Sequence, residues 1–240
     1  MRTLTANNAR TAVGLNKRQV ARLLQRLNET DSMDARVDQA SKLFLGRPYI
    51  ENPLGGGPHK KEVLRVSLDA FDCVTYMEAV LALAASNNAN EFLQELCGLR
   101  YRSGKVLWFK RNHYMVDWLA SNKTRGAIKD LTRGRDTIAR TRTLDVVPGL
   151  PPRRVTFRCF PKRRFASIKH RMRTGDLIMF VSTKERLDVF HTGILIHRDD
   201  RVLMRHATRS AGKVVEQDLA DFLKGNRMSG LILARPLCRP

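Results

Sequence analysis

The sequence predicts an α+β fold in which helices come first along the chain and an antiparallel sheet follows. Two observations predict this order. Apolar residues recur at helical spacing before about residue 125, and five strand-like segments separated by short polar turns follow from residue 155. Helices followed by strands are typical of α+β folds. The 240 residues, 42% of them hydrophobic, are enough for one domain with a sizeable core.

The first half of the chain predicts four longer helices and one short one. Val20, Leu23, Leu24 and Leu27 give residues 16–29 one apolar face, and a second helix is expected over 34–45. Glycines and prolines then make 46–61 a loop. Helices are expected over 71–86 and 87–99, and a short one over 114–122. Between the last two, residues 100–114 are expected to form a hairpin turning at Ser103-Gly104.

The second half predicts the sheet. Residues 148–154, PGLPPRR, are expected to cross between the two halves of one domain. The expected strands cover 155–160, 176–181, 189–198, 201–208 and 229–237. We therefore expect a single domain over 1–240, made of a helical segment 1–45, a nucleophile loop and helix 46–98, a cleft segment 99–150 and a sheet segment 151–240.

Charge and composition limit the classes of function. The chain carries 44 Lys and Arg against 23 Asp and Glu, a formal net charge of +21, which predicts attraction to a polyanion such as nucleic acid, an anionic membrane or a bacterial wall. The basic run over 153–173 has no base-reading motif beside it, so no specific nucleic-acid contact is expected. The longest apolar stretch, 74–85, is too short and too polar to span a membrane. The first thirty residues lack the pattern of a secretion signal.

Four cysteines are spread along the chain, and one occupies an unusual place. Cys97 has the helical spacing of a buried residue, Cys159 lies among arginines and is an alternative reactive thiol, and Cys238 is close to the end. Cys73 falls at the start of its helix, where Asp72 or Asp69 is the expected N-cap. Unpaired N–H groups and the helix dipole favour a thiolate there, so Cys73 is a candidate nucleophile, with a space-filling buried cysteine as the alternative.

A nucleophilic thiol needs a base, and two histidines can be placed by register. If Asp199 and Asp200 are the two turn residues of a hairpin, facing positions sum to 399, and His191 and His206 become diagonal neighbours on one face. Gly193 opposite His206 would leave open space there. Cysteine, base and a second polar group that orients the base form the triad of acyl transfer. His191 would be the base, His206 the orienting residue, and the Cys73 N–H part of the oxyanion hole. We therefore expect the first turn of the helix to present Cys73 to the strand face that carries both histidines.

The motifs, taken in order, resemble a known family. GRPY at 46–49, FDC at 71–73, GDLIMF at 175–180, HTGILI at 191–196 and RHAT at 205–208 are similar to NlpC-type papain-like cell-wall hydrolases. FDCVTYMEAVLALA, LRYRSG and RNHYMVDW resemble the branch described as N-acetylmuramoyl-L-alanine amidase-like. The likeness runs from about residue 46 to 236. It implies a papain-like fold in which the nucleophile helix packs on the sheet.

The resemblance also implies an activity and a set of site residues. Cys73 matches the nucleophile, His191 the base and His206 the orienting residue. The residues that it places in the substrate cleft are Tyr49, Asp72, Arg111, His113, Asp117 and Trp118. Two structural alternatives are that Trp118 belongs to the core and that Asp117 pairs with Arg111. Val74 and Thr75 stand where the superfamily usually has serine and glycine, which favours the amidase-like branch over an endopeptidase.

The implied reaction is hydrolysis of an amide bond in peptidoglycan or muropeptides, between muramic acid and L-alanine or within the stem peptide. The expected place of action is the periplasm, cell wall or outside of the cell, with cytoplasmic fragment recycling or a secreted effector as alternatives. No cofactor or metal is expected: a zinc site of His113, His191 and His206 lacks a short-spaced ligand pair. A rival reading from another class is a basic, non-enzymatic binding module for wall polymer or nucleic acid.

Overall fold

A computed structural model describes residues 12–27 and 32–238 of the chain. The ends of the predicted domain (1–11, 239–240) and residues 28–31, which include the last two positions of the first predicted helix, lie outside this description. The described helices are α1 Lys17–Gln25, α2 Met33–Lys42, α3 Cys73–Ala84, α4 Ala89–Arg100, α5 Met115–Thr124, α6 Phe165–Ile168 and α7 Leu219–Gly225. The described strands are β1 Ala12–Val13, β2 Leu64–Arg65, β3 Ile128–Asp130, β4 Ile138–Leu144, β5 Arg153–Cys159, β6 Leu177–Val181, β7 Val189–Arg198, β8 Arg201–Thr208, β9 Lys213–Asp218 and β10 Gly230–Pro236.

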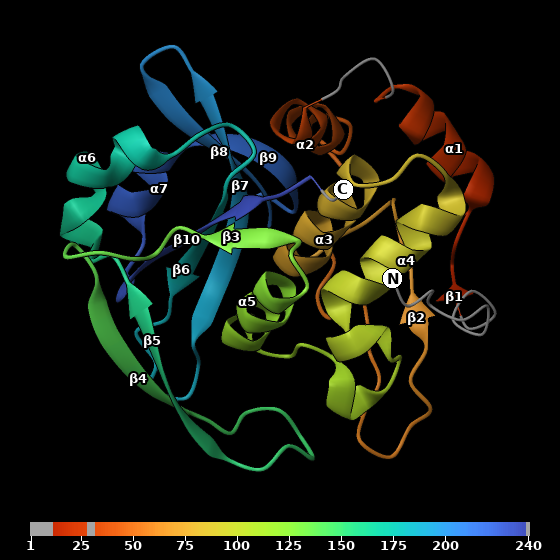
Figure 1. Ribbon diagram of the computed structural model, residues 1–240, viewed down its shortest axis with the longest axis horizontal. Coiled ribbons are helices and arrows are strands. Elements are labelled where there is room, and N and C mark those ends of the chain that lie inside the picture. Colours follow the sequence, from red (N-terminus) through yellow and green to blue (C-terminus); the bar gives the residue numbers. More distant parts are fainter. Residues whose placement is uncertain (1–11, 28–31, 239–240) are drawn as a thin grey trace.

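The fold is a mixture of helices and a large antiparallel sheet, as the sequence predicted. Six strands form the sheet in the order β3-β10-β6-β7-β8-β9, and every neighbouring pair in it is antiparallel. Figure 1 shows the sheet between two groups of helices, with α6 and α7 on one side and the helices from the first half of the chain on the other. The predicted helices are confirmed as α1 to α5, each with its ends shifted by a few residues.

Apolar residues fill both faces of the sheet. The larger cluster joins α3 and α4 to side chains such as Ile194, Ile196 and Leu203 on one face. The smaller cluster joins Leu195, Met204 and Phe222 on the other face. Because successive residues of a strand point to opposite faces, β7 contributes alternately to both clusters. Burial on both sides explains why its segment ILI is continuously apolar.

Three of the local predictions were wrong. Residues 100–114 are not a hairpin: Ser103 and Gly104 do turn the chain with positive φ angles of 56° and 63°, but a single bridge, Tyr101 with Arg111, follows, and Trp108–Lys110 form a 3₁₀ turn. Residues 148–154 are not a crossover, because 148–152 lie in the connection between the antiparallel strands β4 and β5, and 153–154 begin β5. Strand β5 belongs to a separate two-stranded sheet with β4, and not to the main sheet. Strand β4, IARTRTL, carries no apolar alternation that could have revealed this partner.

Candidate active site

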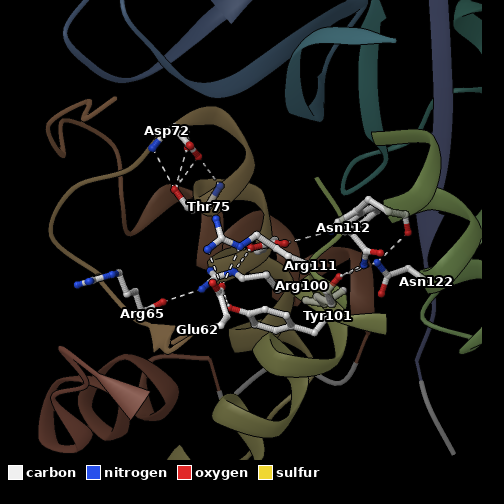
Figure 2. Close-up of polar contacts among 12 residues, drawn as sticks. Glu62, Arg65, Asp72, Thr75, Arg100, Tyr101, Arg111, Asn112 and Asn122 are labelled. Atoms are coloured by element: carbon white, nitrogen blue, oxygen red, sulfur yellow. Dashed lines mark hydrogen bonds and ion pairs between the residues drawn. The ribbon is translucent and has the colours of Figure 1, made fainter. Parts of the chain in front are cut away.

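The first turn of α3 is fixed by a reciprocal cap. Asp72 is the N-cap, which confirms the first of the two predicted candidates: its carboxylate accepts the backbone N–H of Thr75 at 2.7 Å, and the Thr75 hydroxyl accepts the backbone N–H of Asp72 at 3.0 Å. Figure 2 shows this pair of residues at the helix start. Cys73 is therefore the first residue of the helix. The carboxylate of Asp72 is committed to the cap, so its predicted contact with substrate stays a prediction.

The thiol of Cys73 lies against the backbone of β7. The side chain is half-buried, and a hydrogen bond with the backbone of Thr192 lowers the pKa of its thiol. Desolvation of the thiol, followed by the negative charge of Asp72, has a larger effect and raises the pKa to about 12. The expectation of a lowered pKa at the helix start was therefore wrong, because desolvation exceeds the effect of the helix dipole. The resting thiol is protonated at neutral pH.

The predicted hairpin of β7 and β8 is confirmed in register. Ile194 pairs with Arg205, and Arg198 pairs with Arg201, so facing positions sum to 399. Asp199 takes a positive φ of 55°, as a tight hairpin turn requires. The register brings the two histidines together: Nε2 of His191 lies 2.6 Å from Nδ1 of His206, and their ring centroids are 4.9 Å apart.

The histidines lie on the face of the sheet that α3 does not cover. His191 stacks on Phe222 of α7 with centroids 5.5 Å apart, and His206 meets the same ring edge-on at 5.5 Å. Thr192, the next residue along β7, points to the other face, where its hydroxyl lies 3.4 Å from the sulfur of Met77 in α3. The expectation that α3 presents Cys73 to the face that carries both histidines was wrong. The thiol instead contacts the backbone of Thr192.

Gly193 does not open space beside the histidines. A Cβ atom built there would lie 2.5 Å from Cγ of Met204 and 3.1 Å from the carbonyl oxygen of Arg205. The side chain of Met204 fills the room that the sequence argument left empty. A glycine is needed at position 193 because β8 packs closely against it.

Both imidazoles are neutral at neutral pH. Burial, followed by the charge of His206, lowers the pKa of His191 to about 3, and burial lowers that of His206 to about 4. Nε2 of His206 lies 3.2 Å from the amide oxygen of Gln217 in β9, which opposes the second shift. Gln217 was not predicted as a site residue because strand β9 was not predicted. The alternation in KVVEQD after the Gly212 turn was the signal available.

Tyr49 lies near the start of α3. It forms a parallel bridge with Phe71, and its backbone N–H donates to the carbonyl oxygen of Gly212 at 2.8 Å. Burial raises the pKa of its hydroxyl, and the charge of Cys73 is the next largest cause. The half-buried tyrosine thus adjoins the start of α3, whereas contact with substrate stays a prediction.

Arg111 and His113 are held by their own segment and by the glycine-rich loop. Arg111 forms an ion pair with the buried Glu62 at 2.5 Å, and both of its terminal nitrogens donate to the carbonyl oxygen of Gly55, at 2.9 and 3.0 Å. His113 donates from Nε2 to the carbonyl oxygen of Trp108 at 2.9 Å, and burial lowers its pKa. Figure 2 shows Arg111 and Glu62 side by side. Glu62 was missed because it directly follows residues 46–61, which were interpreted only as a loop.

Asp117 and Trp118 differ from each other in exposure. Asp117 pairs with Arg153 of β5, and not with Arg111 as the structural alternative supposed. Trp118 has no exposed surface, and its indole N–H donates to the carboxylate of Glu78 at 3.2 Å. It therefore packs in the core, which was the structural alternative for this residue.

A buried acid links α5 to the histidine strand. Asp188, immediately before β7, accepts the backbone N–H of Val116 at 2.7 Å in the first turn of α5. Burial raises the pKa of its carboxyl group. On the other side of α5, Glu78 of α3 bonds Trp118 and forms an ion pair with Arg100 at 2.7 Å. Helix α5 is therefore fixed both to the nucleophile helix and to the strand that carries His191.

The described residues bear on two alternatives that the sequence left open, a metal site and a second reactive thiol. Among residues 12–27 and 32–238, no three His, Cys, Asp or Glu side chains gather as a metal site would require. Cys159 is fully buried, and burial raises its pKa, so it has neither the exposure nor the acidity of a reactive thiol. Within the same residues, no helix has the length and apolar character needed to cross a membrane.

Solved structures share this fold. A Legionella pneumophila protein of the DUF1460 family superposes with a TM-score of 0.79 at 24% identity, over 92% of this chain and 96% of that one. An N-acetylmuramoyl-L-alanine amidase from Bacteroides uniformis gives 0.75 at 24% identity, over 85% and 98%. A putative xylanase from Bacteroides fragilis gives 0.67 at 23%, over 82% and 99%. At these identities the likeness shows the fold alone. A comparison with curated proteins found no match.

The sequence itself identifies the class of protein. The model of the family described as AmiA-like, N-acetylmuramoyl-L-alanine amidase-like, matches residues 39–231, a range that includes Cys73, His191 and His206. The chain belongs to this family. The predicted resemblance to the amidase-like branch is thereby confirmed, and membership places the protein among amidase-like hydrolases associated with peptidoglycan.

Proposed function

We propose that the protein is a cysteine hydrolase of the NlpC-type papain-like group that cleaves the amide bond between muramic acid and L-alanine in peptidoglycan or its fragments. The observation that carries the proposal is the arrangement along β7. His191 is hydrogen-bonded to His206 at 2.6 Å, and the next residue, Thr192, contacts the thiol of Cys73 through its backbone. The proposed nucleophile therefore contacts the strand residue next to the proposed base, in a chain of the amidase-like family, and this adjacency supports the proposal.

The first half of the proposed reaction forms an acyl-enzyme. Because thiol and imidazole are both neutral at rest, His191 takes the thiol proton as sulfur attacks the amide carbonyl carbon, and not beforehand. The carbonyl oxygen becomes an oxyanion, which the backbone N–H of Cys73 at the helix start stabilises together with a neighbouring donor. When the C–N bond breaks, the proton passes from His191 to the nitrogen of L-alanine. The muramoyl group remains on sulfur as a thioester.

The second half releases the acid. Water loses a proton to His191 and attacks the thioester carbonyl, and the departing thiolate takes that proton back. The products are a muramic acid carboxylate and a stem peptide with a free L-alanine amino group. His191 returns each proton that it takes, and the proposed steps need no metal ion and no redox partner.

The middle segment is proposed to bind the stem peptide. Both terminal nitrogens of Arg111 donate to the carbonyl oxygen of Gly55, so a substrate carboxylate would compete with the loop for the same donors. His113 and Asp117 flank this segment, and Tyr49 and Asp72 adjoin the thiol. The positive charge of the chain fits a wall-associated place of action, since a basic surface concentrates an enzyme near an anionic wall.

Cys73→Ala tests the proposal, with Cys238→Ala as a matched control because Cys238 is exposed and at the far end of the chain. We expect release of stem peptides from a defined muropeptide to be lost in the first variant and unchanged in the second. Mass spectrometry then identifies the bond. A free L-alanine amino terminus supports an amidase, whereas a new terminus inside the peptide indicates an endopeptidase. Full turnover by Cys73→Ala would rule out the cysteine mechanism, and wall binding without turnover by the wild type would support a binding module.

A further inference from the structure

His206 sits in the middle of a chain of three hydrogen-bonding groups. Its Nδ1 lies 2.6 Å from Nε2 of His191, and its Nε2 lies 3.2 Å from the amide oxygen of Gln217. Gln217 pairs with Met204 across β8 and β9, which makes it the diagonal neighbour of His206. The imidazole is almost completely buried, with 1% of its surface exposed, so water has little access to either nitrogen.

The amide oxygen of Gln217 sets the donor and the acceptor of each hydrogen bond in this group of three side chains. An amide oxygen only accepts, so Nε2 of His206 carries the proton and donates to Gln217. A neutral imidazole has one N–H, and Nδ1 of His206 is then the acceptor. Nε2 of His191 must donate to it, which leaves Nδ1 of His191 with its lone pair free. This is the nitrogen that can act as a base.

The opposite direction would disable the base. Without an acceptor at position 217, the proton of His206 can move to Nδ1 and donate to His191, whose own proton would then occupy Nδ1. The other neighbours cannot decide between the two directions. Among the described residues, the remaining ring contacts of the pair are with Phe180, Phe190 and Phe222, whose side chains neither donate nor accept conventional hydrogen bonds.

We propose that Gln217 is a positioning residue that fixes the proton direction through His206 and keeps Nδ1 of His191 free for catalysis. This inference rests on the proposed function for its catalytic consequence, but the proton positions themselves do not depend on it. Among the described residues, the side chain of Gln217 bonds His206 and has no recorded contact with the thiol, and the proposal gives it no contact with substrate. Its effect passes entirely through His206.

Gln217→Met tests the inference, because methionine has a similar length and lacks the amide acceptor. Gln94→Met, on the exposed side of α4, is the control. A neutral hydrogen bond contributes about 1 kcal/mol, so we expect kcat to fall by a factor of about 5 to 10 with KM unchanged. In a His206→Ala background the same change should have no further effect. An equal loss in both backgrounds would show that Gln217 acts by another route and would overturn the inference.

Nitrogen-15 NMR of the histidine rings provides a test that needs no activity. In the wild type we expect the proton of His191 on Nε2, and in Gln217→Met a measurable population with the proton on Nδ1. A wild-type spectrum with the proton on Nδ1 refutes the inference even if the variant does not fold. If Cys73→Ala proves fully active while these spectra are as expected, the proposed function fails and the role of Gln217 in placing the protons stands.

Discussion

Acidification should destabilise this protein through the buried histidine pair. An imidazole in the unfolded chain has a pKa near ~6.5, whereas burial holds the pKa of His191 at about 3 and that of His206 at about 4. Below about pH 6.5 the unfolded chain therefore binds protons that the folded protein does not, and unfolding becomes more favourable. The stabilisation is complete above about pH 6.5 and is lost as the pH falls toward the folded values.

The size of the effect follows from these values. Between about pH 7.5 and pH 5, each histidine removes about 2 kcal/mol from the free energy of unfolding, and the pair removes about 4 kcal/mol. For a chain of this size each kcal/mol corresponds to about 2–4 °C, so the Tm should fall by roughly 8–16 °C. Thermal unfolding followed by circular dichroism measures this fall.

A double variant isolates the contribution of the pair. His191→Gln with His206→Gln removes both titrating rings, so its Tm should depend much less on pH over the same interval. Burial also raises the pKa values of Glu78 and Asp188, which stabilises the folded state on acidification, but both proteins share that effect. If the Tm of the wild type falls no further than that of the double variant, the histidines are not held neutral in the fold and the argument is refuted.

Two further predictions concern a buried ion pair and a close contact between two strands. Arg100→Met would leave the carboxylate of Glu78, which is 2% exposed, without its ion-pair partner. The free energy of unfolding, measured with urea, should then fall by about 3–5 kcal/mol. Adding Glu78→Met should recover most of this loss, and no recovery would contradict the prediction. Gly193→Ala would drive its methyl group into Met204 and should cost about 1–3 kcal/mol in the same assay. A free energy of unfolding equal to that of the wild type would show that β8 can shift to accommodate the added methyl group.

Much of the fold was predictable because its signals are local. The helix that begins at Cys73 follows from an aspartate cap and an apolar run, and the β7–β8 register follows from a two-residue turn. The turn fixes which residues pair, so it also predicted that His191 and His206 meet.

The rest depended on contacts between distant segments. The turn does not determine which face of the sheet α3 covers, and the histidines lie on the other face. The helix position of Cys73 predicted a lowered pKa for its thiol, but the burial of Cys73 in the folded protein decides the direction of the shift. Strand β4 was missed because its arginines and threonines carry no apolar alternation. Strand β9 and Gln217 were missed although KVVEQD does alternate.

The place of β10 in the sheet has a consequence for synthesis. This strand comes last along the described chain, yet it lies between β3 and β6 in the interior of the sheet. While the ribosome is still making residues 230–236, β6 has an open edge of wholly apolar side chains, and an edge of that kind readily pairs with other chains. The nascent protein is therefore open to pairing with other chains until β10 emerges, and the proposed site on β7 would lie on an incomplete sheet for the same interval.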